Sequence, residues 1–506
     1  MNNQNKWNKS TYKYLLSIFL YLISIHIYAA APGVAFPVNT MTNGNQYLLD
    51  IGMDSSGRSI VLWQDSAQGN LSFMRRYTND TPFQTSEWYV GSTTDTATDG
   101  AGNYVTVHTA SDASGTGVYA TVYDQYGNII VNTFRVNSVT TGDQNGPTVT
   151  MNTSGEFAVV WTGYQSGVAA VYARKFHANG VPYSNDVMAS SANGSSQYAM
   201  DIDMADNGLF AVSWVSFIPT GTITDVWGRR MSSTGGALGS AFRANTYTTS
   251  IQAGTSIALD ASGNFIITWE SYSQDGNEYG IYGQRYSSTG SKLGTEFRIN
   301  NITTGSQQLA TVGMAANGDF AVAWQHDNRN NDPSSNPSIQ AREYFANGTP
   351  KGNQFQVSPE SSDAKNFKPK IGMDGNGNFL IAWQKYNVPT AEYDVYARYY
   401  YNVPVTVLTN GVTVTNLSGS ADSWQYFKIT VPPGTSTMDV NMRGTTGDAD
   451  LYIKYDSLPS DTNWDIRPWL NGSTELVRIN TPPAGDFYIG INGYTAFSGV
   501  SLEVLY

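Results

Sequence analysis

The apolar residues of this chain recur in short runs that predict strands rather than helices. A pattern of Gly, any residue, Phe or Tyr, three residues and Trp occurs five times, as in "GEFAVVW" and "GNFIITW". Two weaker copies are "GRSIVLW" and "GNYVTVH". The seven copies, 45 to 59 residues apart, end at Trp63, His108, Trp161, Trp214, Trp269, Trp324 and Trp383. Nearly continuous apolar runs of this length are typical of strands covered on both faces, so they predict a β-repeat.

Each repeat is predicted to contain four strands. In the fifth copy these are residues 255–260, 263–269, 280–286 and 295–300, separated by segments rich in Gly, Ser, Asp and Asn. Such residues are typical of tight turns between antiparallel strands. No sustained helical period interrupts the pattern. Four-stranded units of this size, repeated seven times, favour a β-propeller.

The start of the repeat region looks like the end of a repeat. The segment "VAFPVNTMTNGNQ" (34–46) resembles "TEFRINNITTGSQ" (295–307), in which the first six residues belong to a fourth strand. The seventh repeat has no fourth strand after residues 394–400. We therefore expect residues 36–39 to pair with that strand and to remove an unpaired sheet edge. The predicted fold over residues 31–402 is a seven-bladed β-propeller closed by the N-terminal strand, with an open solenoid or two sandwiches as alternatives.

The segment before the repeats has the pattern of a secretory signal peptide. Lys6, Lys9 and Lys13 precede the apolar residues 14–27, and three alanines follow at 29–31. We expect residues 1–30 to be removed near these alanines. The alternative, an uncleaved anchor, is disfavoured because the apolar run is shorter than the roughly 20 residues of a membrane span. The prediction is export, to the extracellular space or the cell surface via the periplasm, with no membrane insertion after cleavage.

The pattern changes in residues 403–506. The strands alternate more cleanly between apolar and polar residues there, and the turns "VPPG" and "TPPAG" separate them. This predicts a compact antiparallel β-sandwich as a second domain.

Composition narrows the possible partners. The chain has 506 residues, no cysteine and a formal net charge of −12. An acidic protein of this kind is a poor ligand for nucleic acid, and we expect no nucleic-acid partner. Disulfides and cysteine-bound zinc are excluded. We expect a monomer.

Two resemblances follow from these motifs. The repeats over residues 34–401 are similar to tandem repeats of large secreted and surface proteins of bacteria, which implies an extracellular protein. The C-terminal region resembles the bacterial pre-peptidase C-terminal (PPC) domain in "DADLY" (448–452), in the strand at 484–488 and in its ending at 493–502. This resemblance implies a module appended to secreted enzymes, often proteases, that assists export or attachment to insoluble substrates.

A serine or zinc peptidase is hard to build from the residues of this sequence. After the expected signal peptide only His108, His177 and His326 remain, and there is no HExxH or GxSxG motif. His108 stands in a tryptophan position and His326 in a polar loop. A glycosidase needs only two carboxylates about 5 to 10 Å apart. The candidates are Glu270, Asp275 and Glu278, between the second and third strands of the fifth repeat.

Calcium is a weaker possibility, and we expect no required cofactor. The candidate calcium ligands are Asp275 with Glu278, and Asp448 with Asp450. Turns such as "MDSSGR" and "MDGNGN" also contain oxygen ligands, but Asp followed by Gly is ordinary turn chemistry.

Aromatic residues at the ends of the second strands are the candidate ligand-binding residues. Tyr164, Phe217, Tyr272 and Tyr386 fall on the variable face, where they can stack on a sugar or grip a peptide. The favoured interpretation is a secreted, non-catalytic binding or adhesion protein that recognises extracellular glycan or protein. The alternative is a secreted hydrolase, a glycosidase rather than a peptidase, whose C-terminal domain targets it to substrate.

Overall fold

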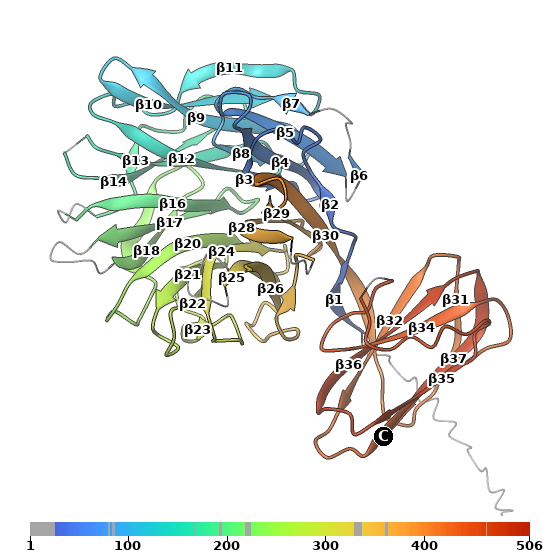
Figure 1. The fold of residues 1–506 in the computed structure, drawn as a ribbon. Coiled ribbons are helices and arrows are strands. Elements are labelled where there is room, and N and C mark those ends of the chain that lie inside the picture. The colour runs from blue at the N-terminus through green and yellow to red at the C-terminus, as the bar shows by residue number, and fades with distance from the viewer. Residues whose placement is uncertain are drawn as a thin grey trace, which may run out of the picture.

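The structure, a computed structural model, describes residues 26–78, 81–82, 87–165, 167–191, 195–217, 224–327, 336–359, 363–461 and 463–506. Within these ranges every regular element is a β-strand (Figure 1). No segment there forms a helix that could cross a membrane. Residues 1–25 of the expected signal peptide lie outside the described residues.

The repeat region forms seven sheets, one for each copy of the sequence pattern, in the part of the chain that is described. The first three sheets contain β3 (Gln46–Met53), β4 (Arg58–Asp65), β5 (Leu71–Thr78), β6 (Thr81–Pro82) and β7 (Trp88–Tyr89); β8 (Asp95–Thr98), β9 (Tyr104–Asp112), β10 (Gly115–Tyr123) and β11 (Ile129–Arg135); and β12 (Gln144–Met151), β13 (Phe157–Gly163), β14 (Ala170–Phe176) and β15 (Val187–Met188).

The next three sheets contain β16 (Gln197–Met204), β17 (Phe210–Phe217), β18 (Thr224–Met231) and β19 (Ala237–Arg243); β20 (Gln252–Leu259), β21 (Phe265–Tyr272), β22 (Tyr279–Tyr286) and β23 (Phe297–Arg298); and β24 (Ser306–Met314), β25 (Phe320–Asp327), β26 (Ser338–Tyr344) and β27 (Phe355–Gln356). The seventh contains β28 (Ala364–Met373), β29 (Phe379–Asn387) and β30 (Glu392–Val407), with β2 (Phe36–Pro37) and β1 (His26–Pro32) both paired to β30.

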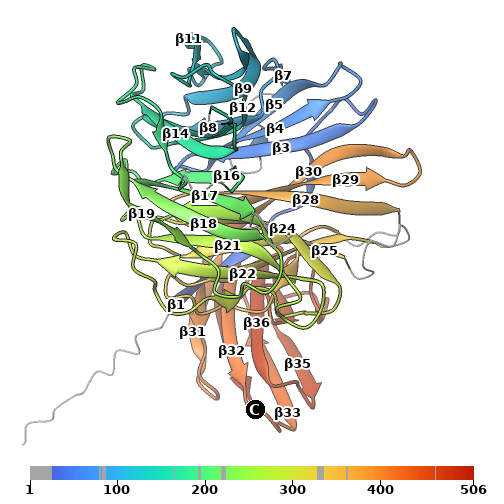
Figure 2. The ribbon, with the colours of Figure 1, turned by 90° about the vertical axis from the view of Figure 1, so that its left-hand side faces the viewer.

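The first strand of every repeat sheet lines one central channel of about 580 Å³. Figures 1 and 2 show the sheets arranged around it, each with its later strands farther out. This is the arrangement of a β-propeller, in which each sheet covers the faces of its neighbours.

Aromatic residues fill the space between the sheets, as the repeat pattern predicts. The six motif tryptophans are fully buried. Five of the six lie directly opposite an aromatic residue of the third strand, in the pairs Trp63 with Phe73, Trp161 with Tyr172, Trp214 with Trp227, Trp269 with Tyr282 and Trp383 with Tyr396. His108 stands in the same position and stacks on Tyr119, with ring centroids 5.8 Å apart. His108 therefore takes the place of the tryptophan in packing against the third strand.

An asparagine that recurs after the fourth strand in four of the repeats has a physical role. Its side-chain oxygen accepts the backbone N–H of a third-strand residue, which otherwise has no partner because the fourth strand is short. The four pairs are Asn39 with Val395, Asn137 with Val118, Asn245 with Val226 and Asn300 with Ile281, at 2.7 to 2.9 Å. Serines do the same in two other sheets, with Ser190 binding Val171 and Ser358 binding Ile339.

The N-terminal strand takes the fourth-strand position of the seventh sheet. Phe36 is paired with Ala397, and the N–H of Val38 donates to the oxygen of Val395 at 2.8 Å. This is the pairing expected from the sequence. At the other end of the seam the hydroxyl of Tyr399 donates to the oxygen of Gly57 at 2.9 Å. The first and seventh sheets are therefore in direct contact.

The strand β30 does not end with the repeats. It continues to Val407, and its last residues pair in parallel with β32, so that Val405 lies opposite Tyr426. The expected boundary at residue 402 therefore lies inside a strand. β1 follows the same stretch, with Ala31 opposite Tyr401 and Ala29 opposite Val403. In Figure 1, β1 and β30 run together from the repeat sheets to the C-terminal domain.

The C-terminal domain is built from two sheets. One contains β32 (Trp424–Val431), β36 (Gly485–Gly493) and β34 (Ala449–Tyr455); the other contains β31 (Val414–Gly419), β37 (Phe497–Leu505), β33 (Thr437–Arg443) and β35 (Glu475–Asn480). Their inner faces share one apolar core, which includes Phe427, Leu451, Ile489 and Val500. A sheet-on-sheet domain agrees with the prediction for this region.

Candidate functional site

The central channel contains a ring of seven equivalent positions. Each lies four residues before the start of the turn between the first and second strands, and each pairs with the residue that precedes the motif Trp or His. We call this set the channel ring: Asp50, Asp95, Thr148, Asp201, Ser256, Thr311 and Lys370. Three carboxylates, three hydroxyls and one ammonium therefore face the same channel at one level.

Several side chains of the channel ring bind the next sheet. Asp95 accepts the N–H of Val149 at 2.8 Å, and Asp201 accepts the N–H of Ile257 at 2.9 Å. Ser256 accepts the N–H of Val312 at 3.3 Å. The first strand of each sheet has a free edge whose N–H groups need acceptors. These contacts give the ring a structural role between neighbouring sheets.

Two members of the channel ring, Asp95 and Lys370, have raised pKa values. Burial raises the pKa of Asp95 well above its ordinary value, and the neighbouring carboxylate of Asp50 raises it further. Lys370 Nζ lies 3.6 Å from Asp50 Oδ1. Enclosure by the channel walls would lower the pKa of Lys370, but Asp50, Asp95 and Asp201 together raise it. The lysine side chain keeps 44% of its accessible surface, because the channel admits water.

One more acid faces the channel, two residues beyond the ring. Burial raises the pKa of Asp203 to about 7, although its carboxylate accepts the N–H groups of Leu259 and Met204. Leu259 belongs to the next sheet, so this acid also joins two sheets.

The three acids proposed for catalysis do not converge. Glu270 is buried and accepts the N–H of Leu309, in the sixth sheet, at 2.6 Å. The carboxylate of Asp275 lies on the face of β22 toward which a Cβ of Gly280 would point. Glu270 lies opposite Ile281, the next residue of that strand. Since side chains alternate between the faces of a strand, Asp275 and Glu270 lie on opposite faces of the fifth sheet. Glu278 lies in the same loop and is half-buried.

The expected calcium ligands have other partners. Asp450 forms an ion pair with Arg467 at 2.6 Å, and Asp448 accepts the N–H of Gly472 at 2.9 Å. Asp275 accepts the N–H of Asn277, and its second oxygen has no hydrogen-bond partner. Within the described ranges no group of three or more His, Asp or Glu is close enough to hold a metal ion. A cation beside Asp450 would have to displace Arg467, so this pair does not suit calcium.

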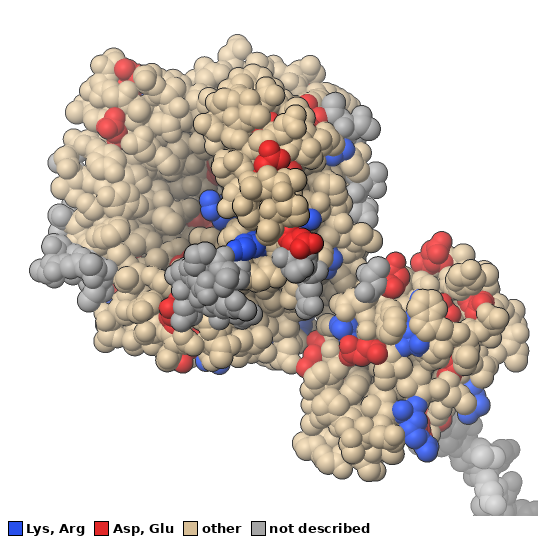
Figure 3. All heavy atoms as spheres, viewed as in Figure 1, with Lys and Arg blue, Asp and Glu red and all other residues tan. Residues whose placement is uncertain are grey.

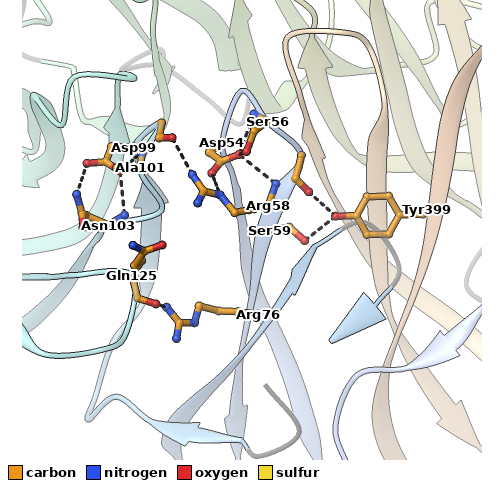
Figure 4. A network of polar contacts seen from close by, with 12 residues as sticks. Asp54, Ser56, Arg58, Ser59, Arg76, Asp99, Ala101, Asn103, Gln125 and Tyr399 are labelled. Atoms are coloured by element: carbon orange, nitrogen blue, oxygen red, sulfur yellow. Dashed lines mark hydrogen bonds and ion pairs between the residues drawn. The ribbon is translucent and has the colours of Figure 1, made fainter. Parts of the chain in front are cut away.

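The acids of the turns between first and second strands cap those turns. Asp54 accepts the N–H groups of Ser56 and Arg58, and its other oxygen binds the Arg58 side chain at 2.7 Å (Figure 4). Asp99 binds Ala101 and Asn103 in the same way. Donors from the turn itself therefore occupy oxygens that a calcium site would need.

The candidate ligand-binding aromatics lie at the ends of second strands, on the side of the sheets where the first strands begin. We call this side the loop face. Phe217 is 43% exposed and packs edge-on against Tyr198, and Tyr272 is 38% exposed and packs against Tyr279. Tyr386 packs against Tyr393. Tyr164, which is half-buried, interacts with Tyr198.

Apolar residues that were not predicted join this face. The first strands carry a bulge near their start, and Met200 and Leu309 lie in two of these bulges. Both side chains are exposed and line the channel. The channel ring lies at a constant distance from the turn, but no single residue type marks either the ring or the bulge in the sequence.

The prediction for His326 was wrong. It lies in β25, is buried, and its Nδ1 is 3.1 Å from Nε2 of Gln307. Strand β25 is longer than the motif suggests, so residues after the tryptophan remain in the sheet.

Charged side chains are sparse on the molecule. In the view of Figure 3 most of the surface is uncharged, and acidic and basic residues gather where the repeat sheets meet the C-terminal domain. This distribution agrees with the 13% of charged residues in the sequence.

Comparison with known proteins identifies the C-terminal domain. Residues 424–493 match the family described as Bacterial pre-peptidase C-terminal domain. A segment of 103 residues is 37% identical to alkaline serine exoprotease A of Vibrio alginolyticus, and covers 20% of this chain and 19% of that protein. A segment of 98 residues is 37% identical to a zinc metalloprotease of Helicobacter pylori, covering 19% and 38% respectively. The match thus spans a minor part of these relatives.

Solved structures similar to the repeat region are more distant. An ulvan lyase of polysaccharide lyase family PL25 is 11% identical, with a TM-score of 0.45, over 72% of this chain and 97% of its own. The Aleuria aurantia lectin, a six-bladed β-propeller that recognises fucose, is 12% identical with a TM-score of 0.39. The similarity covers 63% of this chain and 97% of the lectin chain.

Proposed function

We propose that this chain is an extracellular, non-catalytic binding protein. Its repeat sheets form a seven-bladed β-propeller closed by the N-terminal strand, its loop face binds a glycan, and its C-terminal PPC domain is an accessory module. Relatives of that domain include proteins named as extracellular proteases, which supports export. A monomer is sufficient for this function.

One observation carries the proposal: exposed aromatic side chains lie at the ends of second strands, on the side of the sheets where the exposed apolar residues Met200 and Leu309 line a polar channel. Phe217, Tyr272, Met200 and Leu309 lie on the loop face. Sugar rings present apolar faces that pack on aromatic rings and hydroxyls that bind polar groups. The hydroxyls and carboxylates of the channel ring provide such polar groups. A net charge of −12 favours a neutral ligand over an anionic one.

The test compares aromatic residues on the two faces. Phe217→Ala and Tyr272→Ala should each weaken glycan binding about tenfold or more, as loss of an aromatic anchor does. Tyr126→Ala is the matched control, because Tyr126 is 61% exposed but lies in the turn between third and fourth strands, on the opposite face. Glycan-array screening followed by calorimetry measures the effect. Unchanged glycan binding in both variants would sink the proposal, and binding only to proteins would redirect it to a protein partner.

A secreted hydrolase is the second candidate, and the pair Asp50 and Asp95 is the observation in its favour. A carboxyl with a raised pKa beside a second carboxylate can serve as an acid. These two groups interact directly, however, whereas glycosidase pairs stand about 5 to 10 Å apart to admit water or sugar. Release of reducing sugar that disappears in Asp95→Asn or Glu270→Gln would favour the hydrolase over the binding protein.

A further inference from the structure

A backbone amide of β1 binds a largely buried carboxylate of the sixth sheet. The N–H of Ala30 donates to Glu343 Oε2 at 3.1 Å, across 313 residues of sequence. Glu343 lies in β26, and its side chain is 12% exposed. The contact joins the strand that precedes the repeats to the second-last repeat sheet.

The direction of this amide follows from the pairing of β1. The N–H of Gly33 donates to the oxygen of Tyr399 at 2.8 Å, and the pairing continues through Ala31 opposite Tyr401 and Ala29 opposite Val403. In an antiparallel pair, alternate residues direct their amides to the partner strand. The amides of residues 29, 31 and 33 therefore face β30, and that of Ala30 faces away from it toward Glu343.

Glu343 has too little positive charge around it. The nearest cation, Lys351 Nζ, is 3.9 Å from Glu343 Oε1 but 3.0 Å from Asp319 Oδ2, so one lysine serves two carboxylates. Burial raises the pKa of Glu343, and Lys351 and the Ala30 amide only partly offset this rise. A buried carboxylate without a full partner is unfavourable, and a second cation would relieve it.

We propose that the mature protein begins at Ala30 and that its α-ammonium group forms an ion pair with Glu343. Hydrolysis of the Ala29–Ala30 peptide bond consumes one water. The carboxylate of Ala29 leaves with the leader, and the amine of Ala30 takes up a proton. The proposal rests on the export signal expected in residues 1–30, and it is independent of what the loop face binds.

This position is distinguished from the neighbouring ones by strand geometry. A cut after Ala30 would place the ammonium on Ala31, whose amide faces β30, and would remove the donor from Glu343. A cut after Ala29 removes the pairing of residues 26–29 with 403–406 and the packing of Ala29 against Val405 and Tyr426. Residues 30–32 keep their pairing with β30. The ion pair between the new ammonium group and Glu343 offsets the contacts that are lost.

The first measurement is the mass and N-terminal sequence of the protein secreted from the full-length gene. The expected first residue is Ala30. A mature chain that begins at any other residue, or an uncut chain, overturns the proposal. This measurement needs no variant and does not depend on ligand binding.

The second measurement tests the ion pair. Glu343→Gln keeps an oxygen that accepts an amide but loses the charge, so the Tm of the secreted protein should fall by a few degrees at pH 7. Glu296→Gln is the matched control. Glu296 accepts the N–H of Thr246, and in the next sheet Gln354 naturally accepts the equivalent N–H of Asn301, so this substitution should leave Tm unchanged.

The pH dependence separates an ammonium from an ordinary amide. An α-amine has an ordinary pKa of about 7.7 to 8.0, and pairing with Glu343 raises it in the folded state. Its contribution is therefore complete below this range and is lost as the pH rises through the raised pKa. The difference in Tm between wild type and Glu343→Gln should shrink between about pH 7 and 9.5. A difference independent of pH overturns the ion pair.

Other groups facing Glu343 do not confuse this window. They are Lys351, Asp319, Tyr400 and Tyr488. Burial raises the pKa of Tyr400 to about 12 and that of Tyr488 higher still. Lys351 and Asp319 are present in both the wild type and Glu343→Gln, so their own contributions are common to the two proteins that are compared.

Discussion

Glu270 illustrates how one residue can look catalytic and act structurally. Its carboxylate sits against Gly254, where a Cβ would lie 2.3 Å from Oε1. Gly254 also has a φ of +54°, which favours glycine. Any side chain at this position would displace the acid. The acid and the glycine therefore fit together as one unit of the first-strand bulge.

The pH dependence of stability follows from this environment. Burial raises the pKa of Glu270 to about 7, so the folded protein holds a proton that the unfolded chain releases at about pH 4.5. Stability should therefore fall as the pH rises from about 4.5 to 7. Glu270→Gln should remove part of that fall and stabilise the protein at pH 8 by about 1 to 3 kcal/mol. Urea unfolding at pH 5 and pH 8 measures it.

The matched control is Glu503→Gln, in the C-terminal sheet β37, where the acid binds the hydroxyl of Thr413 at an exposed site. That substitution should leave the difference in unfolding free energy between pH 5 and pH 8 unchanged. Equal stability changes for Glu270→Gln at pH 5 and pH 8 would contradict the raised pKa.

The residues that are best predicted from the sequence are those of one type that recur at the same position of each repeat. The buried tryptophans and the aromatic residues opposite them recur at fixed spacing, so their packing was predictable. The channel ring was not, because its seven positions hold four residue types and no single motif marks them. Asp50, Asp95 and Lys370 come together only because three sheets bring equivalent positions to one axis.

At the scale of elements, the irregular first strands escaped prediction. Their register shifts place Leu309 and Lys368 at φ values of +56° and +49°, where glycine is usual. Leucine and lysine do not favour a positive φ, so neither residue marks the position of a bulge in the sequence. The regular second and third strands, by contrast, follow directly from apolar runs and turn residues.

The short fourth strands depend on their asparagine, and this gives an element-scale prediction. Asn39→Ala leaves the N–H of Val395 without its acceptor and should destabilise the protein by about 1 to 3 kcal/mol. Hydrogen exchange at Val395 should also speed up. Asn128→Ala, in an exposed turn, is the control and should change stability by less than about 0.5 kcal/mol. Unchanged exchange at Val395 would show that the N-terminal strand does not close the seventh sheet.

At the scale of the whole molecule, the two domains share a strand instead of a linker. β30 pairs with β29 in the repeat region and with β32 in the C-terminal domain. The hydroxyl of Tyr488 also donates to the oxygen of Lys351 at 3.4 Å, across the junction. The sequence indicated two domains from the change in pattern, but it gave no sign that one strand serves both.

A shared strand should make the two domains move as one body. Small-angle scattering of the full chain should fit a single rigid shape. Two glycines inserted between Asn402 and Val403 should broaden the distribution of radii of gyration, since glycine adds backbone freedom to the strand. The same insertion between Asn347 and Gly348, in a surface turn, is the control. A broad distribution for the unmodified protein would contradict the rigid junction.

The contact between Asn39 and Val395 also constrains the order of events during synthesis. These residues are 356 positions apart, so the N-terminal strand can pair only after the seventh and last repeat has been synthesised. Until then the nascent chain carries an open edge that can pair with other chains. Because the chain has no cysteine, no disulfide can hold this seam, and hydrogen bonds and packing alone keep the N-terminal strand in the seventh sheet.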